Sequence, residues 1–430
     1  MRSARAWIYV LLFTGCTINY VDRVALSVAA APIAAQFHVS PVGMGYLFSA
    51  FLWTYLVALI PWGVAIDRLG TRWATAGGMA LWSLATVLTG LAGSYPAIFV
   101  MRLTMGLGEA STYPSGGRVI REWIPSGERG LATVVFNSGG YAGPAFGAVL
   151  VGAVASAFGW RAGFIAAGVT GFIWLAVWLA WFRRPEDSPY LGAAERARIL
   201  RERGGGADPE AGAGRGAGLP ALLRNRTLWA LFVTQGCAVY AQYLFLTWMP
   251  SYLQATRHLG ILQTGLYSAL PYAVAVLGTM LVGRLSDRML RARGAAGGQR
   301  RYTVAGMMLV SAVILAVPFV ADIRLILLLF TVSLTGIASA VGLNIALLND
   351  LLAEPGDSGK ANGFLVSGGN LFGILAPILT GYVVAGTGRY DGAFLIAGGL
   401  LLCGATVCLL LTRQPIAAAR RASATYGAAA

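Results

Sequence analysis

The sequence predicts an all-α membrane protein with twelve transmembrane helices, which form two pseudo-symmetric six-helix bundles. Three observations support this fold class. First, 57% of the 430 residues are hydrophobic and only 11% are charged, whereas soluble domains carry about 25% charged residues. Second, we count twelve stretches that are apolar over the ~20 residues that a helix needs to cross a bilayer. Third, two motifs of the first half return in the second half in the same order.

Each apolar stretch is expected to be a helix, because backbone N–H and C=O groups within lipid must be satisfied inside the segment itself. In chain order the expected spans cover residues 6–36, 42–66, 73–93, 96–120, 130–155, 160–182, 227–255, 262–286, 302–320, 324–349, 361–385 and 390–412.

One long polar segment separates the sixth span from the seventh. It contains a short amphipathic stretch from Glu195 to Arg203, followed by a run rich in Gly, Ala and Pro that reaches Pro220. This composition is typical of a flexible linker. We therefore expect an N-terminal bundle over 1–182, a cytoplasmic linker over 183–226, a C-terminal bundle over 227–413 and a cytoplasmic tail over 414–430.

The net charge of +15 is explained by membrane topology rather than by nucleic-acid binding. Of the 32 basic residues, 26 fall in loops and tails on the side of the N-terminus, and four fall in loops of the other side. This asymmetry follows the positive-inside rule and predicts that both termini are cytoplasmic. The single Lys beside 31 Arg suggests a GC-rich bacterial genome. We expect a multi-pass monomer in the bacterial inner membrane.

The two halves of the chain resemble each other. Residues 63–68 (Gly-Val-Ala-Ile-Asp-Arg) return as residues 283–288 (Gly-Arg-Leu-Ser-Asp-Arg), 220 positions later, and residues 128–140 share six acidic or small positions with residues 357–369. Such parallel repeats are typical of transporters whose substrate site lies between the halves near mid-membrane. The alternative is that the shared small residues serve helix packing alone.

Four charged residues lie inside predicted spans: Asp22 and Arg23 in the first, and Arg102 and Glu109 in the fourth. A charge at bilayer depth costs at least ~2.5–3.5 kcal/mol, so such residues usually line a pathway. Adjacent helical residues point ~100° apart, whereas residues seven apart share a face but are separated by ~10 Å. We therefore expect Asp22 to pair with Arg102, and Arg23 with Glu109. Alternatively, both pairs only hold helices together, although buried pairs are a poor source of stability.

This pairing suggests how the chain could move an anion with protons. If a substrate carboxylate binds Arg23, Glu109 loses its partner and takes up a proton, so that anion and proton cross the membrane together. On this hypothesis Asp22, Glu109 and Arg102 couple transport to protons, and Arg23 anchors the substrate. Protons are then the coupling ion, and no cofactor is expected.

The loop after the second span reads Gly63-x3-Asp67-Arg68-x-Gly70-x-Arg72. This pattern resembles the signature loop of the major facilitator superfamily. In physical terms, a carboxylate at a helix end can pair with neighbouring guanidiniums and with the positive N-terminus of the next helix. The resemblance implies a gate motif that latches the cytoplasmic side of a two-bundle transporter. The residues concerned are Gly63, Asp67, Arg68, Gly70 and Arg72, with Gly283, Asp287 and Arg288 in the second copy.

A narrower resemblance covers essentially the whole chain. Residues 19–23 (NYVDR), 102–114 (R-x3-G-x-GEA-x3-P) and 123–130 (W-x-P-x2-ERG) are similar to the anion:cation symporter branch of that superfamily. The branch includes bacterial proton-coupled aldonate, aldarate and hexuronate carriers. The resemblance implies the roles given above to Asp22, Glu109 and Arg23.

The second half lacks a charged counterpart of Asp22-Arg23, because the position 220 residues later is Gln242-Tyr243. A single Arg suits a monovalent carboxylate, and neutral groups would then bind the hydroxyls of the substrate. Each candidate could instead form a hydrogen bond between helices. The resemblance implies sugar-acid binding by all of them except Ser367. The candidates are Tyr20, Tyr55, Gln242, Ser367 and Asn370.

We expect a secondary active transporter that carries a sugar acid (an aldonate, aldarate or hexuronate) with protons by alternating access. An aromatic or dicarboxylic acid, such as phthalate, tartrate or a hydroxyphenylacetate, is the alternative, and a membrane sensor that binds the anion without transport is a remote one. No enzyme is expected, because no nucleotide-binding motif is present, and the cysteines lack metal-ligand spacing. The expected partners are a small organic anion and the lipid bilayer.

Overall fold

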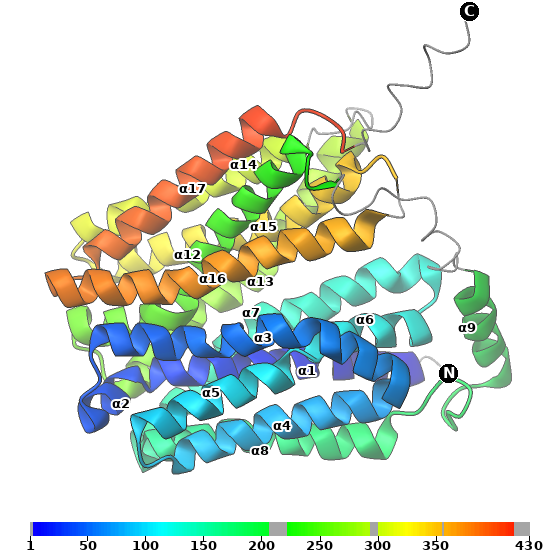
Figure 1. Cartoon of the computed structure of the whole chain (residues 1–430), viewed down its shortest axis with the longest axis horizontal. Coiled ribbons are helices and arrows are strands. Elements are labelled where there is room, and N and C mark those ends of the chain that lie inside the picture. Colours follow the sequence, from blue (N-terminus) through cyan, green and yellow to red (C-terminus); the bar gives the residue numbers. More distant parts are fainter. Residues whose placement is uncertain (1–2, 206–221, 293–299, 355–356, 417–430) are drawn as a thin grey trace, which may run out of the picture.

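The computed structural model describes residues 3–205, 222–292, 300–354 and 357–416, and nearly all of them are helical. Figure 1 shows the helices in two groups that lie against each other, one formed by the first half of the chain and one by the second. The first half contains α1 (Ser3–Val28), α2 (Ala30–Phe37), α3 (Pro41–Leu69), α4 (Thr71–Leu91), α5 (Tyr95–Glu109), α6 (Thr112–Trp123), α7 (Arg129–Phe158), α8 (Trp160–Trp181) and α9 (Ala193–Gly205). The second half contains α12 (Arg226–Arg257), α13 (Ile261–Ala292), α14 (Arg300–Ser311), the 3-10 helix η2 (Ala312–Phe319), α15 (Ile323–Leu351), α16 (Ser358–Thr387) and α17 (Asp391–Leu411).

Several helices begin where a polar side chain caps a free backbone N–H. Ser40 accepts from Gly43 at the start of α3, Ser94 accepts from Ala97 at the start of α5, and Asp322 accepts from Arg324 at the start of α15. Caps of this kind satisfy N–H groups that the helix itself leaves without a partner. The short loops between spans therefore contain the signals that begin the helices.

Ten helices in the described part of the chain are long and apolar enough to cross a membrane. The first and fourth expected spans differ from these ten. The first is α1, which ends at Val28 and is followed by the short helix α2, and the fourth is divided between α5 and α6. Asp22 and Arg23 lower the apolarity of α1, whereas α5 and α6, with 15 and 12 residues, are each too short to cross a membrane alone.

The two halves pack directly against each other. Across the boundary α3 packs on α16, α7 on α13 and α1 on α12 (Figure 1). Small residues make this close approach possible, since a Cβ atom on Gly45 would lie 2.5 Å from the carbonyl oxygen of Pro377. Close helix packing through small residues is typical of membrane proteins.

We call the end of the molecule that carries Arg68, Arg118, Arg288 and Arg300 the arginine-rich end. The contacts between the halves that the described residues show lie from the middle of the molecule to the opposite end. They include the hydrogen bond between the Tyr46 and Tyr382 hydroxyls, the ring contact of Phe48 with Trp248, and the hydrogen bond from Gln254 to the Val28 carbonyl. The structure is thus a conformer in which the halves are joined at the end opposite the arginine-rich end.

The amphipathic stretch expected in the linker is the helix α9, which packs at the arginine-rich end (Figure 1). Arg5 of α1 holds it by bonding Glu195 together with Glu128. Arg198 donates to Glu202 at 3.0 Å and holds the pKa of that carboxyl below its usual value. Residues 206–221 and 417–430 lie outside the described residues, so the expected division into two bundles, linker and tail stays a prediction.

Candidate functional site

The candidate site is centred on Arg23 of α1, which faces the second half of the chain. Its Nε donates to Glu109 Oε2 at 2.8 Å, and its Nη1 donates to the Tyr243 hydroxyl of α12 at 3.2 Å. The Arg23 side chain is 3% exposed and that of Glu109 is 0% exposed. The ion pair predicted between these two residues is therefore confirmed, and it lies where the two halves meet.

Aromatic rings surround the Arg23 guanidinium. Its Cζ lies 4.6 Å from the centre of the Tyr20 ring, 4.8 Å from that of Phe51 and 5.2 Å from that of Tyr55. A guanidinium is attracted to the faces of such rings, most strongly where water is excluded. The rings therefore hold the cation in place without occupying all its hydrogen-bond donors.

Both members of the pair keep unused hydrogen-bonding capacity. Arg23 Nη2 and Glu109 Oε1 are buried, and neither has a hydrogen-bond partner among the described residues. Buried polar atoms almost always have a protein or water partner. The free donor and free acceptor identify a place where a polar ligand or water can bind.

Glu109 reaches the interior because glycines bring its helix close to two others. It is the last residue of α5, just before the break at Ala110 and Ser111. A Cβ atom on Gly108 would lie 2.8 Å from the backbone N of Trp82 in α4, and one on Gly106 would collide with α3. Only glycine permits this approach, which places the carboxylate at the end of a helix inside the bundle.

Asp22 does not form the ion pair that we predicted with Arg102. The Arg102 Nη1 instead contacts the Asp22 carbonyl oxygen at 3.4 Å and the Met105 sulfur at 3.1 Å. The Asp22 carboxylate is wholly buried and lies near Trp82 and Thr86 of α4, but it accepts no hydrogen bond from a described residue. Arg102 of α5 therefore lies at the same depth as Asp22, but the Asp22 carboxylate faces α4 rather than α5.

Sequence reasoning missed Tyr243 as a partner of Arg23. We named its neighbour Gln242, which is half-buried and is not among the partners of Arg23. The signal was present in the repeat, because Tyr243 follows Arg23 by the same 220 positions that separate the two gate motifs. The residue that corresponds to Arg23 in the second half thus meets it across the boundary.

The other candidates lie in different settings. The Tyr20 hydroxyl is 3.3 Å from that of Tyr113 on α6. Ser367 is exposed and donates to the Gly363 carbonyl of its own helix. Asn370 is buried, and its Nδ2 has no partner among the described residues. Ser367 is thus engaged within its own helix, whereas Asn370 has a free donor for a ligand.

A pair of buried amide side chains lies in the second half. Asn344 of α15 donates to Gln235 of α12 at 2.9 Å, and its Oδ1 has no partner among the described residues. The sequence alone gives no indication of this pair, because an amide side chain in a long apolar helix does not reveal its partner.

The gate motifs pair with arginines that we did not predict. Asp67 at the end of α3 accepts from Arg118 of α6 at 3.1 Å, and Asp287 at the end of α13 accepts from Arg300 of α14 at 3.0 Å. Arg300 also bonds Asp350 at 2.8 Å. Each pair lies within one half, so in this conformer the two motifs tie helices of the same half together.

The remaining gate residues shape the turn itself. Gly70 has φ 78°, a conformation that favours glycine, and joins α3 to α4. Arg72 donates to the Leu179 carbonyl of α8 at 2.6 Å. A Cβ atom on Gly63 or Gly283 would meet nothing within 4 Å, and Arg68 and Arg288 are exposed.

The described residues hold no cluster of His, Cys, Asp and Glu that could bind a metal ion. Within them Cys16, Cys237, Cys403 and Cys408 are free thiols.

Two packed helical halves with a buried ion pair at their junction define a membrane transporter. The chain belongs to the Major Facilitator Superfamily, whose family model matches residues 12–297 and 294–426. It is therefore a multi-pass membrane transporter and not an enzyme.

The relatives of this chain include several bacterial anion transporters. It is 31% identical over 423 residues to the probable galactarate/D-glucarate transporter GudP of Bacillus subtilis, and the match covers 95% of this chain and 92% of the relative. It is 31% identical to the probable sulfoacetate transporter SauU of Cupriavidus necator, and the match covers 92% of this chain and 90% of the relative. It is 30% identical to the D-galactonate transporter of an Escherichia coli O6:H1 strain (94% and 94% covered).

Solved structures with the same fold include a bacterial homologue of the human lysosomal transporter Spinster, in an inward-facing and occupied conformation. The TM-score is 0.76 at 18% identity, and the match covers 95% of this chain and 97% of the other. The likeness at this identity concerns the fold alone.

Proposed function

We propose that this chain is a proton-coupled symporter of an organic anion, and that its substrate is a sugar acid. The observation that carries the proposal is the buried pair of Arg23 and Glu109 at the junction of the halves, with one guanidinium nitrogen and one carboxylate oxygen left free. A charged pair at this depth is expensive for a structural purpose alone.

The pair supplies a direct mechanism for coupling. A substrate carboxylate that binds Arg23 Nη2 competes with Glu109 for the same guanidinium. Once displaced, a buried carboxylate without a cation binds a proton, because an isolated charge is strongly disfavoured in a low-dielectric interior. Substrate binding and proton uptake then favour each other. Asp22 is the second proton carrier in this proposal, and Arg102 holds the segment of α1 that contains it.

A sugar acid suits the groups around Arg23. The Tyr243 hydroxyl accepts a hydrogen bond from Arg23, and the Tyr20 ring lies against the Arg23 guanidinium. The Tyr113 hydroxyl is 3.3 Å from that of Tyr20. Hydroxyl groups donate and accept hydrogen bonds and therefore suit a polyhydroxylated acid. The free Nδ2 of Asn370 adds a donor from the second half. The relatives named as galactarate, D-glucarate and D-galactonate transporters support the same substrate class.

Alternating access would move the site between the two sides. We infer that the arginine-rich end is cytoplasmic, following the positive-inside rule, with both termini on that side of a bacterial inner membrane. The present conformer, joined at the opposite end, would then be closed to the outside. The gate pairs of Asp67 with Arg118 and of Asp287 with Arg300 would exchange partners when the cytoplasmic side closes.

The test uses purified protein in liposomes that contain a pH-sensitive dye. D-glucarate, galactarate, D-galactonate, sulfoacetate, phthalate and tartrate are added outside one at a time, and acidification of the lumen is recorded. Acidification by the sugar acids, absent in the Arg23→Ala variant, is the expected result. If only phthalate or tartrate acidified the lumen, the proposal of a sugar acid would be wrong and the substrate would be an aromatic or dicarboxylic acid. Uptake of labelled sugar acid without acidification would refute proton coupling.

A further inference from the structure

A groove lies between α13 and α15 on the surface of the second half, and we call it the α13–α15 groove. Its volume is about 370 Å³, which falls in the range of ~300–1,000 Å³ typical of small-molecule sites. The residues that line it are Leu270 and Val274 of α13, and Arg324, Leu327, Leu328 and Thr331 of α15. Leu270, Val274 and Leu328 are exposed, and both helices are long and apolar enough to cross a membrane. The groove is therefore open along two membrane-spanning helices.

The α13–α15 groove lies near the end of the molecule where the two halves are joined. Helix α15 begins beside Arg324, and near its far end Asp350 bonds Arg300 at the arginine-rich end. Arg324 therefore lies at the opposite end. Because the halves are in contact there, exposed apolar side chains at that end face lipid rather than a space between the halves.

The groove extends inward from Arg324 over most of one leaflet. Thr331 follows Arg324 by seven residues, which is ~10 Å of helix, and the hydrocarbon of one leaflet is about half of ~30 Å. One turn deeper the two helices close on each other, because a Cβ atom on Gly278 would lie 2.4 Å from Thr335 Cγ2. The groove thus has a cation at its outer end and closes at its inner end.

Arg324 provides the free polar group of this groove. The Thr331 hydroxyl donates to the Leu327 carbonyl at 2.7 Å, and the other lining side chains are leucine and valine. The Arg324 guanidinium forms no hydrogen bond or ion pair with a described residue. A ligand that matches the groove therefore combines an apolar chain with an anionic group.

The other arginines expected in loops of this side are already engaged by the protein. Arg161 and Arg257 donate to backbone carbonyls at 3.1 and 2.9 Å. Arg389 pairs with Asp391 at 2.7 Å. Within the described part of the chain, Arg324 differs from these three in having a guanidinium available to a partner from outside the protein.

The charges around Arg324 favour a ligand with net negative charge. Asp322 caps α15 by accepting from the Arg324 N–H at 2.8 Å, so one carboxylate lies nearby. The Arg257 guanidinium donates to the Val320 and Ala321 carbonyls at 2.8 and 2.9 Å, so a second cation lies beside the same loop. Two guanidiniums and one carboxylate leave a net positive charge, which attracts an anionic headgroup more strongly than a zwitterionic one.

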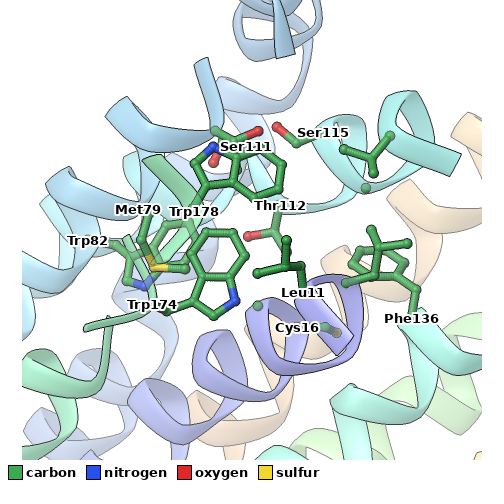
Figure 2. Close-up of a pocket in the computed structure, with 15 residues that line it drawn as sticks. Leu11, Cys16, Met79, Trp82, Ser111, Thr112, Ser115, Phe136, Trp174 and Trp178 are labelled. Carbon is green, nitrogen blue, oxygen red and sulfur yellow. The ribbon is translucent and has the colours of Figure 1, made fainter. Parts of the chain in front are cut away.

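A cavity inside the first half has neither of these properties. Its volume is about 30 Å³, and the side chains labelled in Figure 2, among them Trp82, Phe136 and Trp174, are all buried. The residues that line it include no charged side chain. Lipid cannot reach this cavity, whereas the α13–α15 groove combines access from lipid with a free cation.

We propose that the α13–α15 groove binds an anionic phospholipid of the leaflet on the side opposite the arginine-rich end. The phosphate bonds the Arg324 guanidinium, whose planar fork of donors suits phosphate oxygens. One acyl chain lies in the groove along Leu270, Val274 and Leu328. The lipid thereby holds the start of α15 at the level of the headgroups. The proposal does not depend on the proposed function, because neither substrate nor proton takes part in it.

The first experiment locates the lipid. The purified full-length protein is placed in nanodiscs of phosphatidylethanolamine that contain increasing amounts of phosphatidylglycerol with a photoreactive acyl chain, and crosslinked peptides are identified by mass spectrometry. Crosslinking to residues 270–274 and 324–331 should saturate, and unlabelled phosphatidylglycerol should displace the probe. Crosslinking that rises in proportion to the probe without saturating would show contact with bulk lipid only and overturn the proposal.

The second experiment removes the two parts of the site in turn. Arg324→Gln removes the charge, and the affinity for the probe should fall at least about tenfold, which corresponds to ~1.4 kcal/mol. Val274→Phe keeps the charge but fills part of the groove, and saturable crosslinking should be lost. Arg389→Gln is the matched control, because it removes an exposed arginine of the same end that pairs with Asp391, and it should leave crosslinking unchanged.

Each outcome decides for or against the lipid site. Equal affinity in the wild-type protein and in Arg324→Gln would overturn it, as would equally strong displacement of the probe by phosphatidylethanolamine. Thermal unfolding followed by circular dichroism shows whether each variant is folded. If Arg324→Gln is not, Val274→Phe provides the test, and unchanged crosslinking in that variant refutes binding in the groove. Because transport is not measured, failure of the proposed function would leave these results standing.

Discussion

Glu109→Gln is the most informative single substitution in this chain. Glutamine has the shape of a protonated glutamic acid but cannot ionise, so it should hold Arg23 in the state that the substrate and proton together produce. The wild-type carboxylate bonds Arg23 Nε at 2.8 Å with both side chains buried. The substrate must compete with this bond, whereas in the variant it competes only with a neutral amide.

The magnitude follows from the two kinds of hydrogen bond. A bond to a charged group contributes about 1.5–3 kcal/mol and a neutral one about 0.5–1.5 kcal/mol. The difference of ~1–2 kcal/mol predicts a substrate affinity about five- to thirtyfold higher in the variant at alkaline pH, where the wild-type carboxylate is ionised. If one proton binds with the substrate, the wild-type affinity falls by up to about tenfold per pH unit in that range. The affinity of the variant should not depend on pH.

The assay is equilibrium binding of labelled D-glucarate to the purified protein between pH 6 and pH 8, together with uptake in liposomes. The variant should lose net uptake and keep exchange. Glu128→Gln is the control, because Glu128 lies at the arginine-rich end and pairs with Arg5. A variant that retains the wild-type dependence of affinity on pH would refute the role of Glu109, whatever its uptake.

Three further substitutions test other parts of the site. Arg23→Lys keeps the charge but loses the planar fork of donors, so the affinity for D-glucarate in the same binding assay should fall at least about tenfold; unchanged affinity would remove Arg23 from the site. Tyr243→Phe removes one hydroxyl from Arg23 Nη1 and should weaken binding by about two- to tenfold, and an unaltered dissociation constant would contradict this. Gly45→Ala places a methyl group 2.5 Å from a backbone oxygen of the other half and should separate the halves at that end. Distances between spin labels on α3 and α16 would measure the separation, and they should not change in Gly306→Ala, whose methyl group meets nothing within 4 Å.

The charged residues of the site could be recognised without a structure, but only part of their pairing could. Charges within apolar spans stand out in any sequence, and the pair of Arg23 and Glu109 was correctly predicted. The pair of Asp22 and Arg102 was not, because adjacent residues of a helix point in different directions and the rotation of α1 decides which helix each one faces. That rotation turns Asp22 toward α4 and Arg23 toward the second half.

In the gate motifs, too, the sequence identifies the residues but not their partners. Their sequence repeat identified Asp67 and Asp287 as equivalent carboxylates at helix ends. Their partners, Arg118 and Arg300, lie 51 and 13 residues away on other helices. No local pattern relates these residues, and they meet only because the helices pack at particular angles.

The sequence by itself determined that this protein is a helical membrane protein, because apolarity over the length of a span is a local property that lipid converts directly into helices. It also determined which spans contain charge, and from the repeat it identified the residue of the second half that corresponds to Arg23. The tertiary structure alone decided which carboxylate meets which arginine, where the fourth span breaks, and that the Tyr243 hydroxyl of the second half reaches Arg23. These features depend on the rotation and separation of helices far apart in the chain, which arise from the packing of all the helices together.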